Sequence, residues 1–228
     1  MPTFAEQVLT YHLETLQPDW QLPAGIDLLY PFGTPAARHC MTAFYEKYFA
    51  DNNERTFVVG INPGRFGAGV TGVCFTGPRM LRERCGIEHE VEGRAELSSD
   101  FIYRWIERMG GPEVFYREFY ITSVCPLGFV KDGKNYNYYD SKALERAARP
   151  HIIDCFETQL AFGGRRDYLL VLGEGKNYKF VRALNEERGW FGEVIPLAHP
   201  RYVMQYKRKQ LEEYLNTYVA EAGRALGK

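Results

Sequence analysis

Residues 60–75 read Gly60-Ile-Asn-Pro-Gly-Arg-Phe-Gly-Ala-Gly-Val-Thr-Gly-Val-Cys-Phe75, directly after the apolar run at residues 56–59. The run predicts a strand, and a polar, glycine-rich loop follows its end. In open α/β sheets, ligands bind in the crevice outside the carboxyl ends of the strands, and glycine lets the backbone approach a ligand without an intervening Cβ. A second segment, residues 197–203, follows another short apolar run and places His199 at the end of that run. The two segments together predict one site.

The chain alternates between predicted strands and helices. Apolar, β-branched or aromatic runs predict strands at residues 56–61, 119–124, 168–173 and 191–197. Helical periodicity predicts helices at residues 101–109, 151–162 and 178–188, flanked by others near 4–16, 36–49 and 205–226. Ser99 or Asp100, and Asp140, are the expected N-caps. This alternation favours a single α/β domain over residues 1–228, with three layers, α/β/α, and a central, mostly parallel four-stranded sheet.

Composition gives no global signal for a nucleic-acid partner. The 228 residues are 45% hydrophobic and 25% charged, and the formal net charge is −1. Any DNA binding must therefore come from local basic clusters. Residues 1–6 lack the basic and apolar segments of a signal peptide, and no apolar run is long enough to span a membrane. We therefore expect a cytoplasmic monomer with no membrane partner, associated with the nucleoid if the protein is bacterial.

The cysteine pattern predicts neither a disulfide framework nor a zinc or iron–sulfur site, because the five cysteines are widely spaced and form no Cys-x-x-Cys pair. Residues 85–90 include Cys85, Glu88, His89 and Glu90, whose spacing fits no standard metal site, and we interpret them as a surface loop. Residues 173–177, Gly-Glu-Gly-Lys-Asn, lack the spacing of a phosphate-binding P-loop and are interpreted as a strand-to-helix connection. No metal and no cofactor are expected.

The two site segments, in this order, resemble those of the uracil-DNA glycosylase superfamily, and specifically its single-strand-selective monofunctional (SMUG) branch. Residues 110–120 and 124–129 resemble that pattern on either side of its second core strand, so the resemblance extends from about residue 57 to 201. It implies a divergent SMUG-like enzyme that flips a deaminated base, uracil above all, out of DNA. Such an enzyme hydrolyses the N-glycosidic bond and so initiates base excision repair.

The resemblance also implies roles for individual residues. Asn62 occupies the position of the family's catalytic asparagine, which orients a water toward the anomeric carbon of the sugar. His199 matches the histidine that donates a hydrogen bond to O2 of the leaving base. Phe75 lies thirteen residues after Asn62, where the family has the ring that stacks on the flipped base. Ile61 is assigned to the same base pocket. Gly64 lies where a bulky side chain would exclude a 5-methyl group, so pyrimidines modified at C5 are expected to enter.

Ser123 departs from the family pattern, which has asparagine before its Cys-Pro segment. A hydroxyl pairs less selectively than an amide, and this favours a second interpretation, in which the substrates are deaminated purines such as xanthine or hypoxanthine. A third is a damaged-DNA-binding module with weak catalysis. Residues 131–139 resemble a family loop with Asn135 in register to add a polar contact to the base. The alternative for this segment is an exposed loop that its tyrosines anchor.

The predicted DNA-facing surface follows His199. Residues 201–209 combine basic and aromatic side chains, and Arg201 and Tyr202 replace the small residue and proline that the family has there. Arg201 or Tyr202 would fill the gap left by the flipped nucleotide. Phosphates would be bound by Lys207, Arg208 and Lys209. The alternative is that this basic run is only the solvated start of an amphipathic helix.

Overall fold

The computed structural model describes residues 1–93 and 96–227 and contains the predicted parallel sheet, with strand order β3-β2-β6-β7. The strands are β2 (Arg55–Gly60), β3 (Phe119–Ser123), β6 (Gly164–Leu172) and β7 (Glu193–Leu197). Strand β6 begins earlier than expected, since charged and polar side chains at its start gave no strand signal. The prediction of a four-stranded parallel sheet is confirmed.

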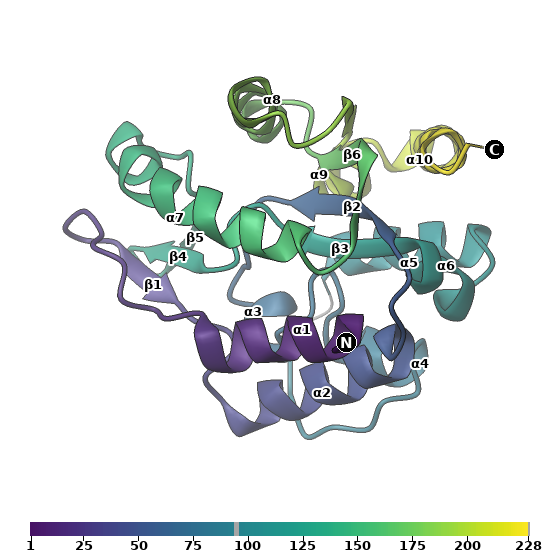
Figure 1. Ribbon diagram of the computed structural model, residues 1–228, viewed down its shortest axis with the longest axis horizontal. Coiled ribbons are helices and arrows are strands. Elements are labelled where there is room, and N and C mark those ends of the chain that lie inside the picture. The colour runs from purple at the N-terminus through teal and green to yellow at the C-terminus, as the bar shows by residue number, and fades with distance from the viewer. Residues whose placement is uncertain (94–95, 228) are drawn as a thin grey trace.

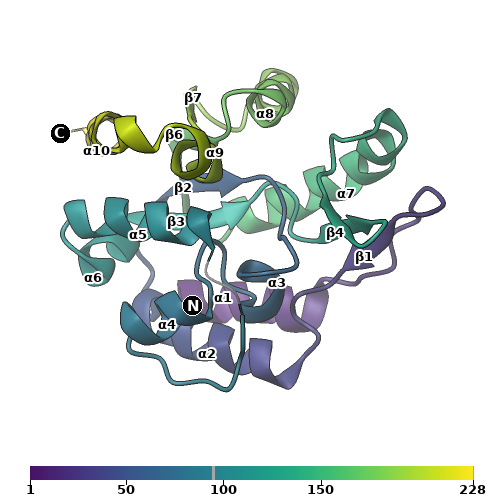
Figure 2. The same ribbon diagram turned by 180° about the vertical axis from the view of Figure 1, so that it is seen from behind.

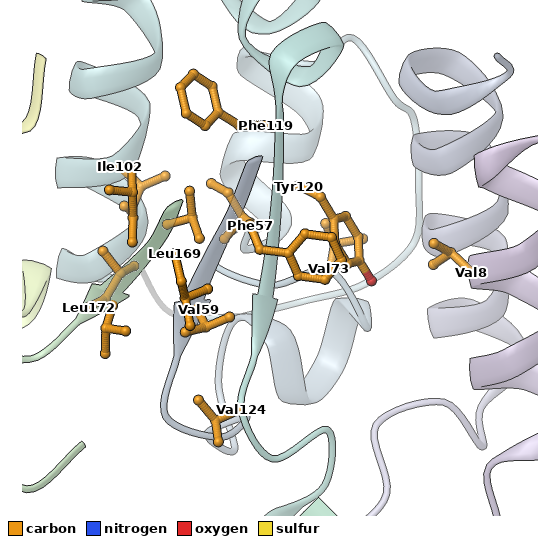
Figure 3. Packing of buried hydrophobic residues seen from close by; sticks show 14 of the residues in the cluster. Val8, Phe57, Val59, Val73, Ile102, Phe119, Tyr120, Val124, Leu169 and Leu172 are labelled. Carbon is orange, nitrogen blue, oxygen red and sulfur yellow. The ribbon is translucent and has the colours of Figure 1, made fainter. Parts of the chain in front are cut away.

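Helices cover both faces of this sheet, as the two neighbours Phe119 and Tyr120 illustrate. Successive side chains of a strand point to opposite faces, and Figure 3 shows these two rings on opposite sides of β3. Tyr120 packs edge-on against Phe4 at the start of the chain. Phe119 lies 6.0 Å from Trp105, which in turn packs against Tyr218 near the end of the chain. In Figure 1, α1 and α2 lie on one side of the sheet and α8 and α10 on the other, which confirms the three-layer arrangement.

The helices match the predicted segments more closely at their centres than at their ends. Their bounds are α1 (Phe4–Thr10), α2 (Pro35–Phe49), α3 (Ala68–Thr71), α4 (Pro78–Glu83), α5 (Leu97–Arg108), α6 (Pro112–Glu118), α7 (Lys142–Leu160), α8 (Lys176–Arg188), α9 (Pro200–Tyr206) and α10 (Leu211–Ala225). A π-helical turn, residues Tyr11–Thr15, extends α1. A 3-10 turn, Arg208–Gln210, separates α9 from α10, so the single last helix predicted for residues 205–226 is wrong.

The predicted N-caps are also wrong. Helix α5 begins at Leu97 with Glu96 as its N-cap, which leaves Ser99 and Asp100 inside its first turn. Helix α7 begins at Lys142, nine residues before expected, because the hydroxyl of Ser141 accepts a hydrogen bond from the backbone N–H of Leu144 at 3.2 Å. Asp140 therefore lies one residue before the N-cap. The helix continues through Pro150, which obscured the periodicity of its first half.

A second, antiparallel sheet was not predicted. It consists of β1 (Asp27–Leu29), β4 (Gly128–Lys131) and β5 (Lys134–Tyr136), in the order β1-β4-β5. Figures 1 and 2 show it at the edge of the molecule far from α5 and α6. Asp132 and Gly133 join β4 to β5 with positive φ angles of 48° and 67°, the backbone of a tight two-residue hairpin turn. The interpretation of residues 131–139 as only a loop is corrected accordingly.

Residues 85–90 are not simply a surface loop, because Cys85 and His89 are buried. The Nε2–H of His89 donates to the carbonyl of Pro78 at 2.8 Å, while its Nδ1 accepts from the N–H of Val91 at 3.2 Å. Both ring nitrogens therefore hold the local backbone together. Within residues 1–93 and 96–227, no helix is long and apolar enough to cross a membrane.

Candidate active site

A cavity of about 290 Å³ opens at the carboxyl edge of the parallel sheet, where Gly60 of β2 pairs in register with Ser123 of β3. Parallel strands bring their carboxyl ends to one edge, so residues distant in the sequence meet there. The predicted residues that line the cavity are Ile61, Asn62, Gly64, Phe75, Ser123, Asn135, His199 and Arg201. Further lining residues, which the sequence interpretation did not name, are Pro63, Ala68, Cys74, Glu96, Ser98 and Asn137.

Asn62 is held in one orientation by backbone groups around its amide. Its Oδ1 accepts a hydrogen bond from the N–H of Tyr138 at 3.1 Å, and its Nδ2 donates to the carbonyls of Pro63 at 3.2 Å and Tyr136 at 3.3 Å. Tyr136 ends β5, so the unpredicted hairpin anchors this side chain. An amide oxygen has two lone pairs. The second remains available to accept a hydrogen bond from a water in the cavity.

His199 precedes α9 and caps it. Its Nδ1 accepts a hydrogen bond from the backbone N–H of Arg201 at 3.2 Å, so the neutral ring carries its proton on Nε2. Burial, and secondarily the positive charge of Arg201, lowers the pKa of His199 to about 4. The hydroxyl of Tyr218, on α10, donates to the carbonyl of Ala198 and fixes the turn from behind. At neutral pH, His199 is thus an uncharged donor held in a defined orientation.

Phe75 forms an aromatic wall of the cavity, and its backbone is strained. Its φ angle is 53°, a left-handed conformation that few residues other than glycine adopt. The ring lies against the bare backbone of Gly60, where an added Cβ would be 2.7 Å from Cε2 of the ring. The ring centroid lies 6.1 Å from that of His199. Close packing on Gly60 therefore keeps the aromatic face beside the histidine donor.

Ser123 is buried at the end of β3. Its hydroxyl oxygen is 3.4 Å from Sγ of Cys74, which lines the same wall. Burial raises the pKa of the Cys74 thiol to about 11. This thiol is therefore protonated at neutral pH, and the wall formed by the two side chains is uncharged.

Gly64 does not leave empty space beside the cavity. A Cβ at this position would be 2.9 Å from Nδ2 of Asn135, so the asparagine amide covers the glycine backbone. Oδ1 of Asn135 accepts a hydrogen bond from the N–H of Arg65 at 3.0 Å. Entry of groups at C5 of a pyrimidine beside Gly64 remains a prediction, and it involves the side chain of Asn135 as well as the glycine.

A groove of about 440 Å³ adjoins the cavity and shares Ile61, His199 and Arg201 with it. Tyr202 and Tyr206 line this groove on successive turns of α9, with ring centroids 5.8 Å apart. Both are among the exposed large aromatic residues, at 43% and 67%. In Figures 1 and 2, α9 lies between α8 and α10. Arg201 thus lines both the cavity and the groove, and Tyr202 lines the groove alone.

The basic run after α9 lines neither the cavity nor the groove. Lys207 is half-buried and Arg208 and Lys209 are exposed in the turn between α9 and α10. Within the described part of the chain, their side chains form no ion pair with an acidic residue. They lie close in sequence to the groove but are not part of the site that contains Asn62 and His199.

Three comparisons relate this chain to known proteins. The family model described as the uracil DNA glycosylase superfamily matches residues 46–223. Single-strand selective monofunctional uracil-DNA glycosylases of Rattus norvegicus and Mus musculus are 28% and 27% identical over 194 residues, 76% of this chain and 66% of each relative. The chain thus spans just under two thirds of the length of those relatives. The crystal structure of wild-type Pedobacter heparinus SMUG2 matches with a TM-score of 0.95 and 42% identity, covering 100% of this chain and 99% of that one.

Proposed function

This chain belongs to the uracil-DNA glycosylase superfamily, and we propose that it is a monofunctional DNA glycosylase that removes a deaminated base, uracil above all, and initiates base excision repair. One observation carries the proposal: Asn62, His199 and Phe75 line a single cavity although they come from distant parts of the sequence. Together they supply a water-binding amide, an aimed donor and a stacking surface. These are the groups that hydrolysis of an N-glycosidic bond requires.

The reaction proceeds by dissociation of the base followed by capture of water. Negative charge develops on O2 of the leaving uracil, and the Nε2–H of His199 donates to that oxygen. A preorganised donor of this kind contributes about 3–4 kcal/mol to transition-state stabilisation. Oδ1 of Asn62 accepts a hydrogen bond from the water that attacks the sugar cation on its anomeric carbon. The proton that this water loses neutralises the uracil anion, so the products are an abasic site and the neutral free base.

The electrostatics of the cavity support this division of roles. The neutral imidazole, with its hydrogen on Nε2, donates a hydrogen bond at neutral pH, and the charge of Arg201 stabilises an anionic leaving group nearby. Within the described residues, no lysine lines the cavity to form a Schiff base with the sugar. This supports hydrolysis alone, without cleavage of the DNA strand.

The DNA partner would follow the adjoining groove. A base in the cavity places its neighbours along the strand over Tyr202 and Tyr206, whose exposed rings offer stacking surfaces. Stacking on an aromatic side chain contributes about 1–3 kcal/mol per base and does not depend on sequence. Such a surface suits unpaired nucleotides.

A second candidate function is the excision of hypoxanthine or xanthine, because the buried Ser123 provides a small hydroxyl where the family has an amide. A shorter side chain leaves more of the cavity for a two-ring base. The binding module without catalysis is less well supported, since both Asn62 and His199 remain in place.

Excision assays test the proposal directly. Purified protein is incubated with single- and double-stranded oligonucleotides that contain one uracil, 5-hydroxymethyluracil, xanthine or hypoxanthine, and alkali then cleaves at abasic sites. We expect cleavage at uracil only after alkali treatment. Strand cleavage without alkali would contradict a monofunctional mechanism, and no abasic sites with any substrate would contradict the proposed activity.

A further inference from the structure

The wall of the cavity contains a carboxylate, that of Glu96, which the sequence motifs did not predict. Glu96 is the N-cap of α5, yet its side chain makes no capping hydrogen bond to the helix backbone. It lines the cavity together with Asn62, Ser123 and His199. Its position in the cavity therefore needs an explanation other than helix capping.

Close contacts hold this carboxylate in place. The hydroxyl of Ser99 donates to its Oε2 at 2.9 Å. The same oxygen lies so close to Gly67 that an added Cβ there would be only 2.0 Å away, so only glycine leaves room for it. Burial raises the pKa of Glu96, whereas the hydrogen bond from Ser99 and the positive charge of Arg201 favour its charged form. The carboxylate is thus ordered and partly screened from water.

Glu96 lines the same cavity as Ser123 and Cys74. Its charge contributes to the raised pKa of Cys74, whose Sγ contacts the hydroxyl of Ser123. Its Oε1 accepts no hydrogen bond from any side chain or backbone group in residues 1–93 and 96–227. Among the described residues, this oxygen thus has no hydrogen-bond partner, and it belongs to a side chain that lines a cavity in which the family's reading amide is absent.

Deamination changes the base in a way that such an acceptor detects. In cytosine and adenine, the ring nitrogen on the pairing edge, N3 or N1, carries a lone pair. In their deamination products, uracil and hypoxanthine, the same nitrogen carries a hydrogen. A carboxylate accepts hydrogen bonds and donates none. It therefore attracts the deaminated ring and repels the lone pair of the normal one.

We propose that Glu96 is a specificity residue that accepts a hydrogen bond from the ring N–H that deamination creates in cytosine and adenine, namely N3–H of uracil and N1–H of hypoxanthine. The inference rests on the proposed function and deepens it. In place of the family's amide, which pairs with uracil, the cavity then has an acceptor for a hydrogen that uracil and hypoxanthine share. Cytosine and adenine lack this hydrogen and are rejected.

Binding measurements test this inference without requiring catalysis. Oligonucleotides carry one 2′-fluoroarabino nucleotide, which resists hydrolysis, with either uracil or cytosine as its base. We measure Kd for the wild type, Glu96→Gln and the control Glu92→Gln, which alters an exposed acid outside the cavity. The glutamine can still accept from Ser99, and its amide can also donate to N3 of cytosine. A lost charge-assisted hydrogen bond corresponds to about tenfold in affinity or more.

We expect the wild type and Glu92→Gln to bind the uracil oligonucleotide more tightly than the cytosine one. In Glu96→Gln, the ratio of the two Kd values should fall about tenfold. Melting temperatures establish that each variant is folded, and Glu96→Ala provides a second test if glutamine perturbs the fold. An unchanged preference in folded Glu96 variants of an active enzyme would overturn this inference alone. A wild type that neither excises uracil nor prefers it would overturn the proposed function as well.

Discussion

The amide oxygen of Asn62 accepts a hydrogen bond from the backbone N–H of Tyr138, 76 residues further along the chain. Tyr138 is buried and follows β5, and its hydroxyl donates to Asn177 of α8 at 2.7 Å. The orientation of the amide thus depends on a hairpin and on a helix that contribute no catalytic group. Because several backbone groups already fix this side chain, it does not have to reorient when the transition state forms.

Replacing Asn62 by alanine should lower single-turnover excision of uracil by at least about tenfold, because the water loses its acceptor. DNA affinity should change little, since the amide acts on the transition state. The control is Asn216→Ala, which alters an exposed asparagine on α10. Excision by Asn62→Ala at the wild-type rate would show that the amide does not orient the water.

Replacing His199 by alanine should lower excision by a similar factor, about tenfold or more. In the wild type, the rate should be nearly constant between about pH 8 and pH 5, because the pKa of His199 lies at about 4 and the ring stays neutral. The measurement is a single-turnover pH–rate profile. A decline centred near pH 6.5 in the wild type, absent from His199→Ala, would mean that the ring titrates like an exposed histidine.

Stability should fall in mildly acidic solution because of two histidines. The pKa of buried His12 is also lowered by burial to about 4, from an ordinary value of 6.5. The unfolded chain therefore binds protons that the folded chain excludes between about pH 6.5 and pH 4, and unfolding becomes more favourable as the pH falls. Urea unfolding at pH 7 and pH 5 measures this difference. It should be smaller in His12→Gln and in His199→Gln, and an equal difference in all three proteins would contradict the assignment.

Replacing Ser123 by asparagine should raise the ratio of uracil excision to hypoxanthine excision. The amide restores a paired donor and acceptor for N3–H and O4 of uracil, and discrimination by such a pair amounts to about 1–3 kcal/mol, or roughly five- to a hundredfold. Both excision rates are measured together with the melting temperature, because Ser123 is buried against Cys74. A folded variant with an unaltered ratio would show that this position does not read the base.

Alanine at Lys207, Arg208 and Lys209 should weaken binding to every single-stranded sequence and flatten its dependence on salt. Each phosphate contact contributes about 0.7 to the slope of log K against log[salt] for single strands, so three contacts contribute about 2. Fluorescence anisotropy at several salt concentrations measures the slope. The control is Arg182→Ala on α8, where Arg182 is paired with Glu186. A wild-type slope in the triple variant would place the phosphate contacts elsewhere.

Much of the fold could be predicted because the core strands are short apolar runs bounded by glycine and polar residues. The small sheet was missed although Asp132-Gly133 is a hairpin signal, since its flanking residues Lys131 and Lys134 are exposed and do not alternate in polarity. Helix ends were misplaced where a cap such as Ser141 preceded the apolar pattern by several residues.

The site was predictable where a motif sits at the end of a strand, as for Asn62 and His199. Glu96 was not, because it precedes a helix and enters the cavity only through packing against Gly67. The prediction for Asn135 was likewise incomplete. Its side chain contacts the backbone at Gly64 and Arg65, which lie about 70 residues earlier in the sequence. Long-range contacts of this kind leave no local pattern in a single sequence.

The contact between Phe75 and Gly60 divides the base cavity into a fixed and an adjustable side. The ring cannot retreat, because the central strand β2 lies directly behind it. The cavity lining also includes Asn135, an exposed side chain on a surface hairpin, which is held by the N–H of Arg65 and can rotate once that hydrogen bond breaks. A larger base would therefore gain its room by displacing Asn135. Bases of different size would share one stacking plane and differ in how far they open the hairpin side.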